Sequence, residues 1–241
     1  MAALRSPFRY DFVGSFLRPQ AIKNARAQFK AGEITRDELT AVENEQITLL
    51  VEKQKRAGYH AITDGEFRRS YWHLDFMWGF AGIDEVELDH GYYFQGEETT
   101  HGSIRVSGKI SGENHPFVEH YKFVKQFEDE NCIARQTMPA PAQLLAELYR
   151  EDNGKNTDAV YPDHEQLLKD IAAAYRTVIR DLYAAGCRSI QFDDCTWGMF
   201  CDPNYQAFLA QAGIKLEDQA NEYLRLNNLA LEGRPADLAL T

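Results

Sequence analysis

The chain alternates between short apolar runs and longer segments in which apolar residues recur every three or four positions. The short runs predict strands, and the longer segments predict amphipathic helices that cover them. Strands that alternate with helices are typical of an α/β protein with parallel strands. The predicted strands are residues 8–15, 60–64, 133–137, 188–192 and 236–241. The predicted helices are residues 19–30, 35–57, 71–78, 116–129 and 162–185, with two more after the fourth strand.

Residues 83–112 interrupt this alternation. Apolar residues occur there in short stretches separated by glycines, a pattern that favours strands and turns over a helix. We therefore expect a β-hairpin inserted after the second strand. A chain of 241 residues can bury the core of one α/β domain, so residues 1–241 are expected to form a single domain.

The number of predicted strands leaves two architectures open. A closed (β/α)8 barrel needs about three more strands than the pattern offers. An open parallel sheet built from the predicted strands would be complete. The pattern of residues alone therefore does not distinguish a partial barrel from an open sheet.

Small and acidic residues stand at the C-terminal ends of three predicted strands. Because the ends of parallel strands meet at one edge, we expect these residues to form one site. A backbone turn with a hydroxyl suits an anion, whereas carboxylates suit a cation. The three groups are Gly14-Ser15, Asp64-Gly65-Glu66 and Asp193-Asp194.

Structural roles can also account for the first two groups and for one residue of the third. The first could be an ordinary turn between a strand and a loop. Glu66 could form a salt bridge to Arg68 or Arg69 on the next turn. Of the two adjacent aspartates, one could hold the ammonium of a ligand while the other caps the following turn.

Aromatic residues lie next to these strand ends. Trp72 and Trp197 could form walls for a flat ligand, although packing in the core is the commoner role of such residues. His73 is the histidine nearest to the predicted site, and nothing in its spacing indicates a metal ligand.

Charge and hydropathy narrow the range of partners. A formal net charge of −11 argues against nucleic acid, which requires a basic surface. No apolar run reaches the length of about 18 residues that a membrane helix needs, and the first residues lack the apolar core of a signal peptide. We therefore expect a cytoplasmic protein that binds a small molecule and contacts neither nucleic acid nor a membrane.

The four cysteines do not match a disulfide framework or a metal-binding pattern. The two closest, Cys195 and Cys201, have five residues between them, and neither belongs to a recognisable ligand pair. We expect reduced thiols, with Cys195 in the wall of the site, and no metal site within this chain. The glycine-rich and nucleophile motifs of dinucleotide, nucleotide and hydrolase folds are absent too.

Three segments, in this order and spacing, resemble the cobalamin-independent methionine synthase family, most closely its short members with one barrel. They are residues 13–19 (VGSFLRP), 63–69 (TDGEFRR) and 191–194 (QFDD). The resemblance covers nearly the whole chain and corresponds to the N-terminal two-thirds of a short member. It implies an incomplete TIM barrel of about five βα units. Members of the family transfer a methyl group from a folate to the zinc-bound thiolate of homocysteine.

The resemblance also implies roles for individual residues. Ser15, with the turn at Gly14, would bind the carboxylate of homocysteine. Glu66 and Asp193 would hold its ammonium group. These roles agree with the chemistry of the residue types. One departure is Asp64, which stands where the large enzymes have a histidine, and another is Asp193-Asp194-Cys195 in place of Asp-Glu-Pro; both leave the methyl donor open.

The expected function is therefore methyl transfer to homocysteine, with a methyltetrahydrofolate as donor. In the family the zinc ligands begin with a His-x-Cys pair after a strand like residues 238–241, so this chain is expected to lack the zinc-binding half. It is then expected to bind no catalytic zinc and not to turn over by itself. The alternatives are zinc-dependent alkyl transfer to another thiol, such as coenzyme M, and a non-catalytic amino-acid-binding or interaction fragment. A partial barrel exposes a sheet edge, so we expect self-association, low stability or completion by another chain.

Overall fold

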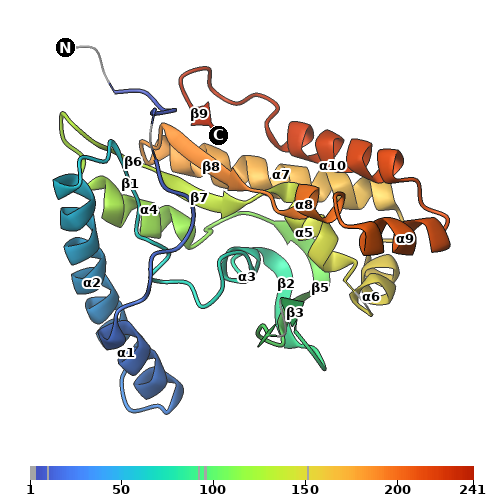
Figure 1. The fold of residues 1–241 in the computed structure, drawn as a ribbon, viewed down its shortest axis with the longest axis horizontal. Coiled ribbons are helices and arrows are strands. Elements are labelled where there is room, and N and C mark those ends of the chain that lie inside the picture. Colours follow the sequence, from blue (N-terminus) through green and yellow to red (C-terminus); the bar gives the residue numbers. More distant parts are fainter. Residues whose placement is uncertain (1–3, 10, 92, 95–96, 151) are drawn as a thin grey trace.

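The computed structural model describes residues 4–9, 11–91, 93–94, 97–150 and 152–241. Helices pack on a small set of parallel strands, which makes a mixed α/β fold (Figure 1). The helices are α1 (Gln20–Lys30), α2 (Arg36–Arg56), α3 (Leu74–Met77), α4 (Phe117–Lys125), α5 (Pro141–Leu148), α6 (Asn153–Val160), α7 (His164–Ala184), α8 (Thr196–Met199), α9 (Pro203–Gln211) and α10 (Leu216–Ala230). The strands are β1 (Ala61–Ile62), β2 (Ala81–Glu87), β3 (Tyr93–Phe94), β4 (Glu97–Glu98), β5 (Gly102–Ser111), β6 (Ile133–Ala134), β7 (Gln136–Pro139), β8 (Ser189–Asp193) and β9 (Ala239–Leu240).

The parallel strands lie in one row. β1 pairs with β6, β7 pairs with β8, and β8 pairs with β9. Only Arg135 separates β6 from β7, and its backbone N–H donates to the carbonyl of Ile62 at 2.9 Å. The order is therefore β1, β6–β7, β8, β9, with all C-terminal ends on one side. Within the described part of the chain these strands do not close into a barrel.

The predicted first strand is not formed. The described residues of the range 8–15 are irregular, and Tyr10 lies outside the described residues. Side chains rather than a backbone ladder anchor this segment, because Asp11 forms an ion pair with the buried Arg135. Gly14 has a φ of 75°, which turns the chain out of the extended conformation that a strand needs.

Most of the predicted helices are confirmed, although α3 is shorter than the predicted residues 71–78 and α4 ends at Lys125 rather than at residue 129. α2 starts at the expected capping box: the Glu38 N–H donates to Thr35 Oγ1 at 3.2 Å, and the Thr35 N–H donates to the Glu38 carboxylate at 2.7 Å. The apolar face of α7 is buried in the core. Helices α5 and α6 were not predicted, and three helices rather than the expected two follow β8. Pro141 at the first turn of α5 is a start signal that could have revealed that helix.

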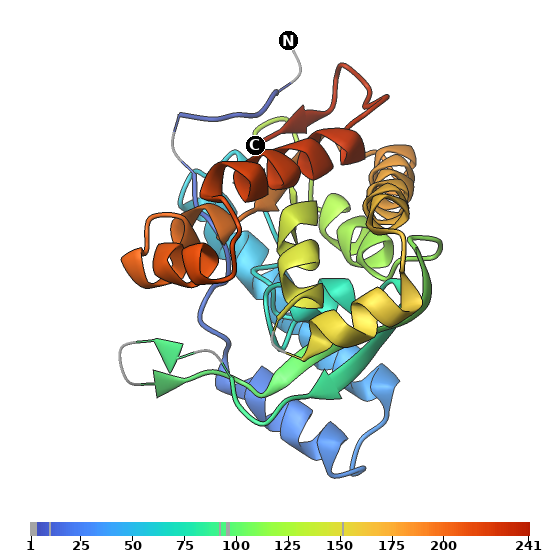
Figure 2. The same ribbon diagram turned by 90° about the vertical axis from the view of Figure 1, so that its right-hand side faces the viewer.

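The interruption at residues 83–112 is antiparallel, as predicted. β2 pairs with β5, with a bulge between Ala81 and Ile83. β3 and β4 form a small hairpin that projects from the body of the molecule (Figure 2). β5 contacts α6 and α7, and through Ile104 and Val106 it joins the main hydrophobic core. None of the described helices is both long and apolar enough to cross a membrane.

Candidate functional site

The C-terminal ends of β1 and β8 border a cleft of about 630 Å³. The irregular N-terminal segment forms its third wall. A second cavity of about 800 Å³ continues from it, because Ser15, Trp72 and Cys195 line both. Most of the residues that the sequence predicts for the site line the cleft, namely Gly14, Ser15, Glu66, Trp72 and Asp193.

A tight turn after β1 presents Glu66 to the cleft. Gly65 and Glu66 both have positive φ, 63° and 60°. For glutamate this conformation costs on the order of 1 kcal/mol, so the surroundings must enforce it. Thr63 Oγ1 accepts from the Gly65 N–H at 3.1 Å. Asp64 Oδ1 accepts from the Glu66 N–H at 2.8 Å, which commits Asp64 to the backbone and leaves the carboxylate of Glu66 for the cleft.

The carboxylate of Glu66 is 1% exposed and incompletely satisfied. Ser15 Oγ donates to Oε2 at 2.9 Å, whereas Arg69 Nη1 lies 3.6 Å from Oε1. Oε1 has no hydrogen-bond partner among the described residues. Burial raises the pKa of Glu66, the charges of Asp64 and Asp193 add to that rise, and Arg69 and Ser15 oppose it. One oxygen of a buried carboxylate is thus available to a ligand.

Asp193 provides a second, partly buried carboxylate at the end of β8. Gln191 Nε2 donates to its Oδ1, and Oδ2 has no partner within the described structure. Burial raises the pKa of Asp193, while the hydrogen bond from Gln191 and the charges of Arg69 and Arg135 lower it. Asp193 and Glu66 therefore share Arg69 as a counter-charge, and each leaves one oxygen unsatisfied.

Asp194 has the structural role that the sequence left open for one of the two aspartates. Its carboxylate accepts from the Thr196 N–H at 3.1 Å at the start of α8, and from Asn227 Nδ2 at 3.0 Å. It also accepts from Trp197 Nε1 at 3.0 Å. Trp197 is 40% exposed and lies outside the residues that line the cleft and its continuation, so the structure does not bring it into the predicted site.

The turn at Gly14-Ser15 is tied to the Glu66 turn by Arg18. Arg18 Nη2 donates to the Glu66 carbonyl at 3.1 Å, and its Nε donates to the Arg69 carbonyl at 3.0 Å. The guanidinium thereby fixes the irregular N-terminal segment over the acidic end of the cleft. Arg18 also lines the second cavity.

Aromatic rings form one wall of the second cavity. Trp72 and His73 lie with ring centroids 4.5 Å apart, and Tyr71 packs edge-on against His73 at 5.6 Å. His73 is 3% exposed, and its Nδ1 has no partner in the described part of the chain. Burial, assisted by Arg150, lowers the pKa of His73 to about 4, so the imidazole is neutral at physiological pH.

Cys195 lies in the wall of the cleft, but the described residues do not fit a zinc site. Its Sγ donates to Gln143 Oε1 at 3.1 Å, and burial raises the pKa of the thiol. A metal ligand must be a thiolate, which this environment disfavours. No group of three or more histidine, cysteine or acidic side chains suited to a metal occurs among the described residues.

The sequence indicated the acids of the site but not the arginine that joins them. Arg69 is 1% exposed and its Nη2 donates to the carbonyl and hydroxyl of Thr137 at 2.6 and 2.8 Å. On the sequence alone, Arg69 was only one of two arginines that could neutralise Glu66. Which arginine pairs with Glu66 depends on Thr137, which is far away in the chain and fixes the guanidinium of Arg69.

Comparison with known proteins relates this chain to one family of synthases. Residues 10–202 match the family described as the catalytic domain of cobalamin-independent synthase. The uncharacterized protein YxjH of Bacillus subtilis is 37% identical over 98% of this chain and 61% of its own length. A 5-methyltetrahydropteroyltriglutamate–homocysteine methyltransferase of Thermosynechococcus vestitus is 28% identical over 90% of this chain and 29% of its own length.

A solved structure shows the same fold. It is a candidate vitamin-B12-independent methionine synthase from Listeria monocytogenes, 37% identical, with a TM-score of 0.78. The match covers 98% of this chain and 65% of that protein. The chain thus spans less than two thirds of the length of both YxjH and the Listeria protein.

Proposed function

Because the chain belongs to the cobalamin-independent methionine synthase family, we propose that its cleft binds the amino-acid end of homocysteine for methyl transfer to the thiol. One observation carries the proposal. Glu66 Oε1 and Asp193 Oδ2 are both buried without a hydrogen-bond partner among the described residues, and both residues line the same cleft. Buried acceptors that lack donors are costly, and the ammonium group of an amino acid supplies three.

Ser15 is suited to the other end of the ligand. In the structure its hydroxyl donates to Glu66 at 2.9 Å. If the hydroxyl turned to donate to the carboxylate of a bound amino acid, the second oxygen of Glu66 would become free for the ammonium. Gly14 has a positive φ, and it has no side chain that could cover the backbone beside this hydroxyl. Ammonium and carboxylate of the same ligand would then lie side by side on Glu66 and Ser15.

We further propose that the parallel strands are part of a TIM barrel. The support is the parallel row β1, β6–β7, β8, β9, with the cleft at its C-terminal ends, where the sites of such barrels lie. The outer edge of β9 is unpaired among the described strands, so it offers a place for self-association or for further strands.

The family uses zinc and a methyltetrahydrofolate. Zinc would stabilise the thiolate of homocysteine, but the described residues do not fit a zinc site, so no role in activating the sulfur is assigned to them. What this chain contributes is recognition: it binds and orients the amino acid. A methyltetrahydrofolate is the proposed donor because the Thermosynechococcus relative is named for one.

Calorimetry tests this recognition directly. L-homocysteine should bind to the wild-type chain, and Glu66→Gln should weaken binding at least about tenfold, since hydrogen bonds to charged groups contribute about 1.5–3 kcal/mol. Glu45→Gln, which removes an exposed charge from α2, is the matched control and should leave the affinity unchanged.

A ligand without the amino group separates ammonium recognition from other contacts. 4-Mercaptobutyrate keeps the thiol and carboxylate of homocysteine, so it should bind weakly to the wild type and equally weakly to Glu66→Gln. The proposed site would be refuted if homocysteine did not bind detectably to the wild type. It would also be refuted if Glu66→Gln lowered the affinity for homocysteine and for 4-mercaptobutyrate equally.

A further inference from the structure

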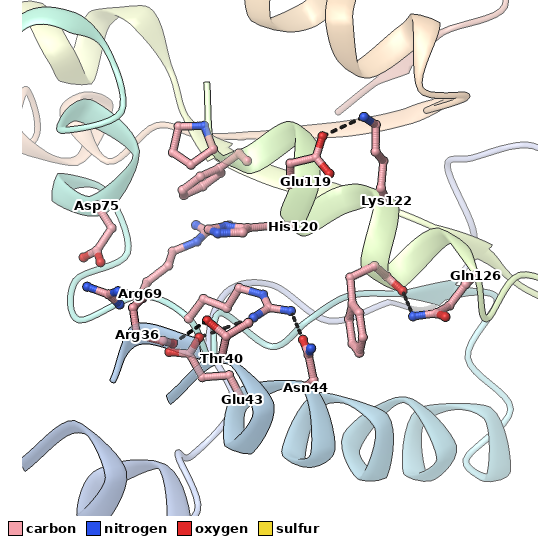
Figure 3. Close-up of a pocket in the computed structure, with 14 residues that line it drawn as sticks. Arg36, Thr40, Glu43, Asn44, Arg69, Asp75, Glu119, His120, Lys122 and Gln126 are labelled. Atoms are coloured by element: carbon pink, nitrogen blue, oxygen red, sulfur yellow. Dashed lines mark hydrogen bonds and ion pairs between the residues drawn. The ribbon is translucent and has the colours of Figure 1, made fainter. Parts of the chain in front are cut away.

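A separate cavity of about 680 Å³ lies between α2 and α4. Figure 3 shows Glu43 and Asn44 of α2 on one side and His120 and Glu119 of α4 on the other. Its volume is in the range of about 300–1,000 Å³ that is typical of small-molecule sites. It shares no lining residue with the cleft or its continuation, but Arg69, which lines it, also pairs with Glu66.

Basic side chains outnumber acidic ones in the wall of this cavity. The basic residues are Arg36, Arg68, Arg69 and Lys122, and the acidic ones are Glu43, Asp75 and Glu119. Glu43 is buried, and two arginines share its carboxylate: Arg68 lies 3.3 Å and Arg26 3.9 Å from it. Arg36 acts on the same carboxylate from a greater distance. Three arginines thus surround one carboxylate, in a protein whose net charge is −11.

The other two carboxylates of the wall are already engaged. Asp75 accepts from the Ser70 N–H at 3.0 Å and the Tyr71 N–H at 2.7 Å. Glu119 pairs with Lys122 at 2.6 Å. Glu119 is therefore neutralised by Lys122, whereas Asp75 keeps its charge and acts on Arg26 and His120 but forms no ion pair among the described residues.

Two arginines of the wall also have unused donors. The side chain of Arg68 is 7% exposed, and its Nη1 and Nη2 contact Glu43 and Asn44. Its Nε has no hydrogen-bond partner among the described residues. Arg69 likewise uses both terminal nitrogens and leaves Nε without a partner in the described structure. Buried N–H donors without partners are rare, and an unseen ion or water is a usual explanation.

Arg36 and His120 are two further donors in the wall of this cavity. The guanidinium of Arg36 stacks on Phe29 at 4.1 Å and forms no ion pair within the described residues. Burial lowers the pKa of His120 to about 4, with Arg68 and Arg69 acting in the same direction and Asp64 and Asp75 opposing it, so His120 offers a neutral imidazole N–H. It comes from the first half of α4, whose start has no side-chain cap and carries a partial positive charge.

We propose that this cavity is a second ligand site, which binds a multivalent oxyanion bearing phosphate or carboxylate groups between Arg36, Arg68 and His120. The site is a separate cavity from the proposed homocysteine site, although Arg69 contributes to both. The oxyanion supplies acceptors for the unused Arg68 donor and the imidazole N–H, and its charge offsets the surplus of arginines. Binding there is driven by charge-assisted hydrogen bonds and weakens as salt is added.

Calorimetry with inorganic phosphate and with citrate, in a buffer without other multivalent anions, tests the site. At least one of the two should bind to the wild-type chain. Arg36→Gln should weaken that binding about tenfold, because it removes one charged donor. Lys155→Gln, which removes an exposed cation of α6 that is absent from this cavity, is the control and should have no effect.

Two further measurements locate the ligand and identify its class. The imidazole NMR signals of His120 should shift on addition of the bound anion, whereas those of the exposed His164 should not. Binding of phosphate alone would indicate a phosphate-bearing ligand, and binding of citrate alone a polycarboxylate. The proposal is overturned if neither anion binds at millimolar concentration, or if Arg36→Gln and Lys155→Gln bind equally well.

Discussion

Arg69 and Glu66 form an ion pair in which both side chains are 1% exposed and Nη1 lies 3.6 Å from Oε1. The separation is too long for a hydrogen bond, so Arg69 provides charge without occupying the acceptor sites of that oxygen. Thr137 holds the other end of the guanidinium through Nη2 at 2.6 and 2.8 Å. The charge of Arg69 therefore opposes the effect of burial on the pKa of Glu66 and still leaves Oε1 open to a ligand.

The first prediction concerns this arginine. Arg69→Met should raise the pKa of Glu66 and Asp193 further, because it removes the positive charge that opposes the effect of burial on both. Homocysteine binding should then be lost at neutral pH and recovered in part at higher pH. The variant should also lose about 3 kcal/mol of unfolding free energy, since the carbonyls of Trp72 and Thr137 lose their charged donors.

Arg69→Lys is the matched variant, because it keeps the charge. Calorimetry across a pH series, together with urea unfolding, should place it between the wild type and Arg69→Met. Identical pH profiles for homocysteine binding in all three proteins would show that Arg69 does not control the acids.

The second prediction is the pH dependence of homocysteine binding in the wild type. The ammonium needs ionised carboxylates, and burial raises the pKa of Glu66 and Asp193. Affinity should therefore fall on acidification at a pH above the ordinary glutamate pKa of about 4.3. Calorimetry at a series of pH values measures the midpoint. Affinity that stays constant down to the ordinary value would contradict the prediction.

The third prediction is that Asp193→Asn stabilises the protein while weakening ligand binding. A carboxyl with a raised folded-state pKa holds its proton more tightly when folded, so stability is lost as pH rises from the unfolded pKa through the folded one. At pH 7 the variant should gain about 1 kcal/mol, and the gain should disappear below the unfolded pKa of about 3.9. Urea unfolding at both pH values measures this.

The neighbouring aspartate provides the contrast. Asp194→Asn should destabilise the protein, because Asp194 Oδ2 accepts hydrogen bonds from both Trp197 and Asn227, and an amide nitrogen in its place would meet two donors. If both variants change stability in the same direction, the division between a binding and a structural aspartate is wrong.

The fourth prediction tests the turn that presents Glu66. Gly65→Ala should lower the unfolding free energy by about 2 kcal/mol or more, because its φ is 63° and a Cβ would lie 2.3 Å from Leu50 Cδ2. Gly58→Ala is the control: its φ is 81°, but a Cβ there meets nothing within 4 Å. The control should lose only about 1 kcal/mol in the same urea unfolding assay. Equal losses would show that packing against Leu50 does not matter.

Local signals explain why much of the framework could be predicted from the sequence. The capping box at Thr35 and the apolar face of α7 involve residues within a few turns of each other, so their consequences are readable without the fold. The prediction of a strand over residues 8–15 failed, because a pattern of apolar residues does not provide a ladder partner. Gly14 turns the backbone away, and the ion pair of Asp11 with Arg135 anchors the segment instead.

The sequence by itself determined the family and the acids that end the strands, because these depend on residue type and spacing. Only the tertiary structure decided which of them act together. Both aspartates line the cleft, but Asp193 keeps an unpartnered oxygen among the described residues, whereas Asp194 is engaged by α8 and Asn227. The structure also left Trp197 outside the cleft and placed Arg69 between Glu66 and Thr137. The physical reason is that desolvation and charge pairing depend on distances between segments far apart in the chain, which no local pattern encodes.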